Sequence, residues 1–336
     1  MKYKFLINLL SLLLSITAVL ESRAQSGKGI VGTIGYYNVE NLFDTEDDIK
    51  INDEEFLPGG DFKWDQKRYE SKIVNISNVI DIMAGGPDIL GLSEIENRKV
   101  LEDLIQKTKL ARHKYQIVHF DSPDRRGVDV ALLYKPSKFQ PFNVERIALT
   151  DPEEPRFRTR DMLWVSGLFM QDTIHVVVNH WPSRWGGKTD KRKLAAELLR
   201  DKIDKVFEKN KDAKIVVMGD FNDDPNNKSI RKILKAGIKL NDDECLYNTS
   251  LPTFRKGYGT LIYNGVWNLF DQIIISQGLL DSRSENYHYK KDSFTVVADD
   301  WMLEKNAGGK PLRTFNAGAY KGGYSDHLPV LIYLEQ

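Results

Sequence analysis

Cysteine is almost absent from this chain, because Cys245 is the only one among its 336 residues. An intramolecular disulfide is therefore excluded, and a packed core must stabilise the fold. A chain of this length can bury such a core as one large domain or as two smaller ones. No cysteine cluster and no His-x-x-x-His pair is present, which argues against a zinc site.

An excess of charge is also missing, since 48 basic residues balance 48 acidic ones. Removal of residues 1–24 would leave 45 basic and 47 acidic residues. This balance excludes a strongly basic surface that holds nucleic acid non-specifically. If nucleic acid is the substrate, we expect its binding to be local, transient and metal-assisted. The chain has no repeat, low-complexity tract or flexible linker, which favours one domain.

One long hydrophobic run is present, at the N-terminus. Lys2 and Lys4 precede an apolar run over residues 5–20, and the small residues Ser22 and Ala24 predict cleavage after Ala24. This pattern is typical of a secretory signal peptide. The alternative is an uncleaved membrane anchor, but a span needs about 20 apolar residues. We therefore expect a signal peptide at 1–24, one domain at 25–336, and an exported protein that is periplasmic or secreted.

Two kinds of periodicity alternate along the rest of the chain. Segments enriched in β-branched and apolar residues predict strands at 30–38, 89–93, 115–120, 128–134, 162–169, 174–180, 214–218, 270–276 and 329–334. Amphipathic segments predict helices at 69–83, 99–108 and 191–207. Consecutive strands between residues 115 and 180 indicate antiparallel sheet. The sequence thus predicts a two-sheet core flanked by helices, with long polar loops at 44–64 and 281–323.

Acidic, amide and histidine side chains follow these strands repeatedly. They gather in residues 37–41, 92–97, 178–184, 217–222, 270–272 and 325–329. Alone, each cluster has an ordinary interpretation: a turn, a cap or a satisfied structural histidine. Together, at strand ends that can converge, they predict one site. Oxygen ligands suit a hard cation such as Mg²⁺, and phosphodiester hydrolysis needs cations, a base and a proton source.

The order of these motifs resembles the endonuclease/exonuclease/phosphatase superfamily. The most specific are Gly219-Asp220-Phe221-Asn222 and Ser325-Asp326-His327-Leu328-Pro329, and the resemblance runs from about residue 30 to 334. It implies an α/β four-layer sandwich of two mixed, mostly antiparallel sheets flanked by helices. It also implies a metal-dependent phosphodiesterase that uses Mg²⁺, with Mn²⁺ or Ca²⁺ as alternatives.

The resemblance assigns roles residue by residue. The implied metal ligands are Glu40, Glu94 and Asp326, and the implied catalytic residues are His180, Asp220, Asn222, Asp271 and His327. Asn38 is the substrate-binding amide of the first motif. Asp271 and His327 are similar to an Asp–His dyad in which the carboxylate fixes the imidazole. We expect His327 to take the proton from water.

Four more residues are candidates around this site. Arg126 and Arg184 are expected to bind phosphate, with Arg160 as a third, because guanidinium groups pair bidentately with phosphate. Asp129 begins a strand, in a region where the deoxyribonuclease I branch places a Glu that orients its second histidine. We expect Asp129 to orient His180, and a plain turn or cap is an equal alternative.

The substrate is expected to be DNA. Phe270-Asp271-Gln272-Ile273, together with His180, resembles the deoxyribonuclease I branch more than the repair nucleases or inositol 5-phosphatases. A sphingomyelinase-type phospholipid substrate is an alternative, since Tyr258, Tyr263, Trp267 and Phe270 could face a bilayer. A phosphoinositide or sugar phosphatase is another. A non-catalytic binding protein is disfavoured, because every catalytic position holds a workable residue. We expect a monomer without a stable protein partner.

Overall fold

The computed structural model of this chain describes residues 29–184, 187–240, 246–282, 286–305 and 309–336. The predicted signal peptide at 1–24 lies outside the described residues. Within these ranges, no helix has the length and apolar character needed to cross a bilayer.

The first sheet has the strand order β14-β18-β1-β2-β4-β3, with β15 also paired to β18. Its strands are β1 (Ile30–Leu42), β2 (Ile89–Ile95), β3 (Gln116–His119), β4 (Asp129–Tyr134), β14 (His288–Tyr289), β15 (Thr295–Val296) and β18 (Val330–Glu335). β1 and β2 are parallel neighbours, and Asn38 pairs with Ser93 across them. Their carboxyl ends therefore bring Asn38 and Glu94 to the same edge.

The second sheet has the order β5-β6-β7-β8-β13-β10-β9. Its strands are β5 (Phe139–Ile147), β6 (Met162–Phe169), β7 (Asp172–His180), β8 (Lys214–Asp220), β9 (Ala236–Gly237), β10 (Leu246–Asn248) and β13 (Asp271–Ser276). Parallel pairing sets His180 opposite Asp220, and antiparallel pairing sets Asp271 opposite Asp220. Three adjacent strands thus deliver three of the predicted catalytic residues to one edge.

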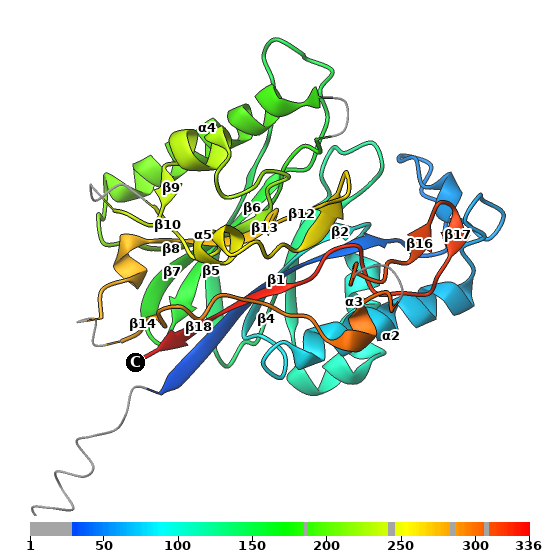
Figure 1. Ribbon diagram of the computed structural model, residues 1–336, viewed down its shortest axis with the longest axis horizontal. Helices are drawn as coiled ribbons and strands as arrows, with labels where there is room; N and C mark the ends of the chain where they lie inside the picture. The colour runs from blue at the N-terminus through cyan, green and yellow to red at the C-terminus, as the bar shows by residue number, and fades with distance from the viewer. Residues whose placement is uncertain (1–28, 185–186, 241–245, 283–285, 306–308) are drawn as a thin grey trace, which may run out of the picture.

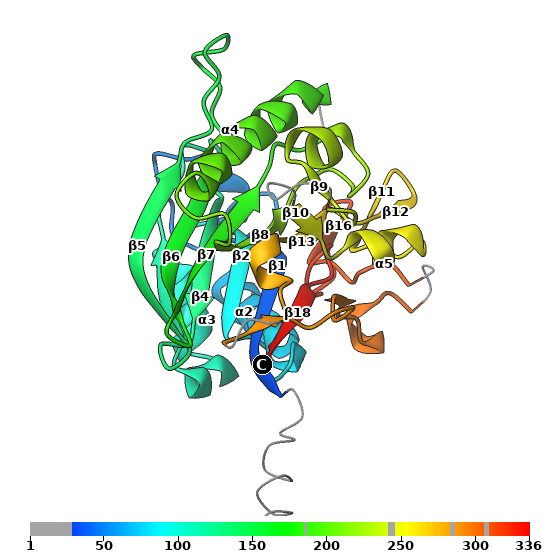
Figure 2. The same cartoon turned by 90° about the vertical axis from the view of Figure 1, so that its left-hand side faces the viewer.

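Helices cover the outer face of each sheet, as the two views in Figures 1 and 2 show. α2 (Gln66–Ile82) and α3 (Arg98–Gln106) pack on the first sheet, and α4 (Thr189–Phe207) packs on the second. Ala195, Leu199 and Ile203 of α4 recur every fourth residue and are fully buried. A third core, which includes Ile34 and Val176, fills the space between the sheets. The predicted α/β four-layer sandwich is confirmed.

Strand β5 and the shorter elements were not predicted from the sequence. β5 contains Pro141, and proline lacks the N–H that a central strand needs. β5 lies at the edge of its sheet, with a register shift between Pro141 and Asn143, so this proline is tolerated. The other short elements are η1 (Glu54–Phe56), η2 (Lys109–His113), η4 (Ser229–Ile233), η5 (Gln277–Leu279), η6 (Asp300–Met302), α5 (Leu251–Arg255), β11 (Leu261–Tyr263), β12 (Val266–Asn268), β16 (Phe315–Asn316) and β17 (Ala319–Tyr320).

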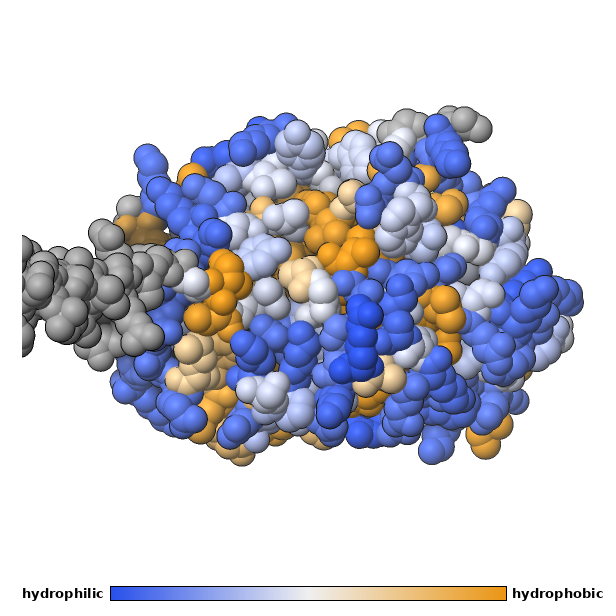
Figure 3. Space-filling view, turned by 90° about the horizontal axis from the view of Figure 1, so that it is seen from below, coloured by the Kyte–Doolittle hydropathy of each residue, from blue (hydrophilic) through white to orange (hydrophobic). Residues whose placement is uncertain are grey.

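The aromatic residues considered for a bilayer contact do not share an exposed surface. Tyr258 is 64% exposed, but Phe270 is only 1% exposed and Arg184 stacks over its ring. Tyr263 and Trp267, on the β11–β12 hairpin, are partly buried. The face in Figure 3 is mainly hydrophilic, with its apolar residues in separate groups. This distribution gives no support to the lipid alternative.

Candidate active site

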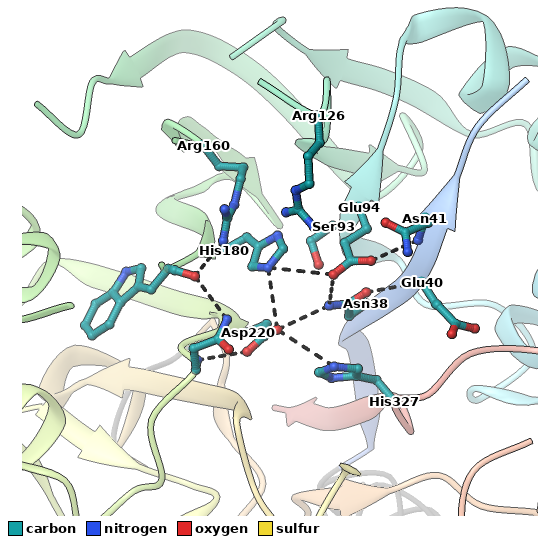
Figure 4. A network of polar contacts seen from close by, with 12 residues as sticks. Asn38, Glu40, Asn41, Ser93, Glu94, Arg126, Arg160, His180, Asp220 and His327 are labelled. Carbon is teal, nitrogen blue, oxygen red and sulfur yellow. Dashed lines mark hydrogen bonds and ion pairs between the residues drawn. The ribbon is translucent and has the colours of Figure 1, made fainter. Parts of the chain in front are cut away.

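The backbone is strained where β1 and β2 meet the site. The register of β1 on β2 shifts between Asn38 and Leu42, and that of β2 on β4 shifts between Ser93 and Ile95. Glu94 is the bulged residue of β2, with a φ of 63°. Such left-handed conformations cost of order 1–3 kcal/mol each in a non-glycine residue and concentrate at functional sites. The bulge turns the Glu94 carboxylate into the site (Figure 4).

Asn38 connects the two sheets at the centre of this arrangement. Its side-chain amide donates to Glu94 Oε1 and to Asp220 Oδ2, each at 3.2 Å. Its backbone carbonyl accepts a hydrogen bond from Ser325 Oγ at 2.7 Å, and the same hydroxyl accepts from the His327 backbone N–H. The Ser-Asp-His motif is therefore fixed to the end of β1. Asn38 is fully buried, so its amide is preorganised.

Two histidines flank the Asp220 carboxylate. His180 Nε2 lies 3.7 Å from Asp220 Oδ2, and His327 Nε2 lies 3.9 Å from the same atom. On its other side, His327 Nδ1 bonds Asp271 Oδ2 at 2.8 Å, which is the predicted dyad geometry. The dyad is almost completely buried, so its hydrogen bond is shielded from water.

These surroundings separate the proton affinities of the three groups. Burial, with the neighbouring Asp271 and Glu94 charges, raises the pKa of Asp220 to about 7 against the opposing effect of His327. Burial opposes protonation of His327, but the Asp271, Asp220 and Asp326 carboxylates raise its pKa well above the usual value. Burial and the Arg160 and Arg126 charges lower the pKa of His180 far below normal. Titratable groups with divergent pKa values are typical of catalytic sites.

Asn222 and Arg184 hold the loop that follows β8. Asn222 has a φ of 49°, its N–H donates to Asp220 Oδ1 at 2.8 Å, and its side chain donates to the Trp181 carbonyl at 3.0 Å. Arg184 donates to the Asn222 carbonyl at 2.9 Å and also to Asp224 and Asn227. The structure therefore assigns Arg184 first to supporting this loop, and its role in phosphate binding stays a prediction.

Arg126 and Arg160 both extend toward His180 and Glu94 (Figure 4). The Arg160 side chain is 6% exposed and bonds Asp124 at 3.0 Å and the Trp181 carbonyl at 2.7 Å. The Arg126 side chain is 52% exposed and lies 3.5 Å from Asp124. Arg126 is thus accessible to an anionic substrate, whereas Arg160 is built into the wall of the site.

This pair of arginines offers a matched test. Arg160→Ala should lower the free energy of unfolding by about 3 kcal/mol, because the buried Asp124 carboxylate loses its buried partner and keeps only the half-exposed Arg126. Arg126→Ala should change it by about 0.5 kcal/mol or less and raise KM about tenfold through one lost charge-assisted contact. Urea unfolding and steady-state kinetics of both variants would check this. An equal loss of stability in the two variants would contradict the assignment.

Glu40 and Asp326 do not join the central cluster. Glu40 points away from Glu94 (Figure 4) and binds the Arg313 side chain and the Thr314 backbone N–H. Asp326 lies 3.0 Å from the same Arg313. Sequence reasoning missed Arg313, since a single arginine in a long loop carries no pattern. It also missed Lys72, although a lysine three residues after Tyr69 and four before Ile76 stands on the apolar stripe of α2.

The expected orientation of His180 by Asp129 is wrong. Asp129 Oδ2 bonds His119 Nε2 at 3.0 Å, and Asp129 Oδ1 accepts from the Ser122 backbone N–H at 2.7 Å. Among the described residues, none hydrogen-bonds to His180 Nδ1. The strand β4 places Asp129 toward its hairpin partner β3, which carries His119.

A divalent ion fits the Glu94 side of the site best. Glu94 is partly exposed and offers a hard oxygen donor, and the Asp220 carboxylate shares the same Asn38 amide. Ligand atoms of Asp220, Asp271 and His327 also lie within 4.8 Å of one another. In that group, however, the short Asp271–His327 hydrogen bond uses the facing atoms. The hydrogen bond suits that group to proton handling, and it leaves Glu94 as the donor that can hold an ion.

Comparisons with known proteins identify the family and the fold. The sequence profile of the Endonuclease/Exonuclease/phosphatase family matches residues 33–336. The search of curated proteins found no match. Similar solved structures include D. rerio TDP2 complexed with a single-strand DNA product, at 13% identity and a TM-score of 0.56, covering 90% of this chain and 98% of that chain.

Two further solved structures share the fold. The human Nocturnin catalytic domain with bound sulfate is 18% identical, with a TM-score of 0.54 and coverage of 91% of this chain and 97% of that chain. A mannosyl-6-phosphatase from Bacteroides thetaiotaomicron is 16% identical, with a TM-score of 0.54 and coverage of 90% and 98%. Identities this low show the fold alone. The profile match spans nearly the whole described chain, and we conclude that this protein belongs to the Endonuclease/Exonuclease/phosphatase family of phosphoesterase hydrolases.

Proposed function

We propose that this protein is an exported, divalent-metal-dependent phosphodiesterase that cleaves DNA. The observation that carries the proposal is the placement of Asp220 between His180 and the Asp271–His327 dyad, with Glu94 beside it. When bound at Glu94, the ion would offset negative charge on the phosphoryl oxygens. The chain itself supplies the groups that move and hold protons.

In this proposal Asp220 accepts the proton from water. Its Oδ1 is held by the Asn222 backbone N–H, which leaves Oδ2 toward the histidines. A carboxylate with a pKa of about 7 is matched to base catalysis near neutral pH. We therefore propose Asp220, and not His327, as the general base. His327, whose pKa is raised, serves as the imidazolium that donates to the phosphoryl or leaving oxygen.

Neutral His180 completes the site from the opposite side. Its Nε2 lies 3.8 Å from Glu94 Oε1 and 3.7 Å from Asp220 Oδ2, so an Nε2–H tautomer can donate to an oxygen bound between these carboxylates. Arg126 extends toward the same space and can pair with a second oxygen of the phosphate. These donors fit a diester whose negative charge must be held from several sides.

Hydrolysis of plasmid DNA tests the proposal. With Mg²⁺ we expect nicking that EDTA abolishes and that Glu94→Gln lowers about 10³-fold, within the range found for loss of one electrostatic group. The matched control is Glu96→Gln. Glu96 accepts from the Asp44 backbone N–H, and burial raises its pKa to about 8, so the amide resembles the protonated native side chain. Full nicking by Glu94→Gln would refute the assignment.

Other substrates distinguish this proposal from its alternatives. Sphingomyelin vesicles, inositol phosphates and mannose 6-phosphate should be hydrolysed at least 100-fold more slowly than DNA. If the enzyme preferred any of them, that compound class would replace DNA as the proposed substrate of this site. Export is tested by N-terminal sequencing of protein from cell fractions, where a mature chain that begins at Gln25 is expected. An intact Met1 in the cytoplasmic fraction alone would contradict export.

A further inference from the structure

Arg313 occupies the space between two acidic residues that the family resemblance assigns to a metal ion. Its Nη2 lies 2.8 Å from Glu40 Oε1 and 3.0 Å from Asp326 Oδ2. Its Nε also donates to Glu40 Oε1 at 2.8 Å. One guanidinium nitrogen therefore sits at the point from which both carboxylates can be reached.

The second oxygen of Glu40 is also occupied. Glu40 Oε2 accepts from the Thr314 backbone N–H at 2.7 Å, and Lys72 Nζ lies 3.8 Å away. Lys72 is itself buried and donates to Thr314 Oγ1 at 2.6 Å and to the Tyr324 carbonyl at 2.8 Å. Because Glu40 is only 4% exposed, these protein donors and cations take the place of water around its carboxylate.

The charges around Glu40 and Asp326 also disfavour a metal ion between these two carboxylates. The Glu40 and Asp326 carboxylates are each within reach of Arg313, and the buried Lys72 lies beside Glu40. A divalent ion added between the two carboxylates would be repelled by these two cations, which already supply the opposite charge there. Buried ion pairs are maintained by such matched partners together with hydrogen bonds to the remaining lone pairs.

We propose that Arg313 is the resident cation of the Glu40–Asp326 pair, so that the site takes a single divalent ion, at Glu94. Arg313 thereby neutralises Asp326, the residue next to His327, without an exchangeable ion. It also connects the segment that precedes β16 to the end of β1, because Arg313 and Thr314 both bond Glu40. The count of one ion rests on the proposed function, in which the metal binds at Glu94. The absence of an ion at the Glu40–Asp326 pair rests on Arg313 alone.

Counting bound Mn²⁺ by electron paramagnetic resonance tests this inference without an activity readout. The purified protein should bind one Mn²⁺, and Glu94→Gln should bind none. Arg313→Gln keeps an amide that can donate to Glu40 but removes the charge. It should therefore bind a second Mn²⁺, with an affinity at least tenfold higher than any binding of a second ion by the wild type. Arg313→Lys, the matched control, keeps the charge and should bind one. Arg313→Gln combined with Glu40→Gln should return to one.

Each outcome decides the inference. Two ions in the wild type, or no additional ion in Arg313→Gln, would overturn it. A third outcome is no ion in the wild type, one ion in Arg313→Gln and none in the double variant with Glu40→Gln. This outcome would support the role of Arg313 and contradict metal binding at Glu94. No binding in either protein would overturn the inference. Arg313 is 42% exposed, and circular dichroism establishes whether its variants fold. If Arg313→Gln does not fold, the wild-type count decides: one ion supports the inference and two overturn it.

Discussion

Replacement of Asp220 by Asn is expected to lower kcat for phosphodiester hydrolysis by about 10³-fold or more, within the range attributed to a general base. Asn keeps the size of the side chain and its hydrogen bond from the Asn222 backbone N–H. It cannot accept the proton from water. Because burial raises the pKa of Asp220 to about 7, its ionised form opposes folding above that pH. The melting temperature at pH 8 should therefore stay unchanged or rise.

The matched control for this variant is Asp103→Asn. Asp103 is another buried aspartate, on α3, that accepts from the Tyr69 hydroxyl at 2.9 Å and pairs with Lys107. It is remote from the dyad, and its replacement should leave kcat within about twofold while lowering stability, as loss of a buried hydrogen-bonded charge does. A large fall in kcat for both variants, or a fall in melting temperature for Asp220→Asn alone, would indicate a structural role for Asp220.

Replacement of Asp271 by Asn should lower kcat about 10²- to 10⁴-fold, because the carboxylate orients the His327 ring and supports its charge. The alkaline limb of the pH–rate profile should also move to lower pH. In the native dyad the neighbouring carboxylates hold the pKa of His327 well above normal, against burial, so the imidazolium persists as pH rises. Without Asp271, the ring loses its proton earlier. A merely structural residue would lower kcat without moving this limb.

The same pair predicts how stability depends on pH. The folded-state pKa of His327 is raised, so its contribution to stability is fully present below its unfolded pKa of about 6.5 and is lost as pH rises through the folded value. Asp271→Asn should flatten this dependence in urea unfolding measured from pH 6 upward.

The double variant with His327→Ala should lose little more activity than either single variant, since the two residues act as a unit. Additive losses would contradict the dyad.

Strand and helix positions were predictable where one periodicity dominated. The strand predicted at 162–169 matches β6 residue for residue. The helix predicted at 191–207 from its apolar stripe corresponds to α4. β5 was missed because Pro141 is acceptable only at an edge, and edge position is a property of the sheet. The convergence of Glu94, His180, Asp220, Asp271 and His327 was predicted by motif order, and the register of neighbouring strands accounts for it.

The family, the two-sheet architecture and the types of residue that reach the site could be predicted from the sequence, because strand periodicity and local motifs depend on neighbouring residues. The partners of those residues became known from the fold. Asp129 bonds His119 and not His180, and Glu40 faces Arg313, which lies 273 positions away in the chain. Such pairings depend on which distant loops the fold brings close together. Local sequence does not predict them, because a charged side chain can pair with any suitable partner that the fold brings within reach.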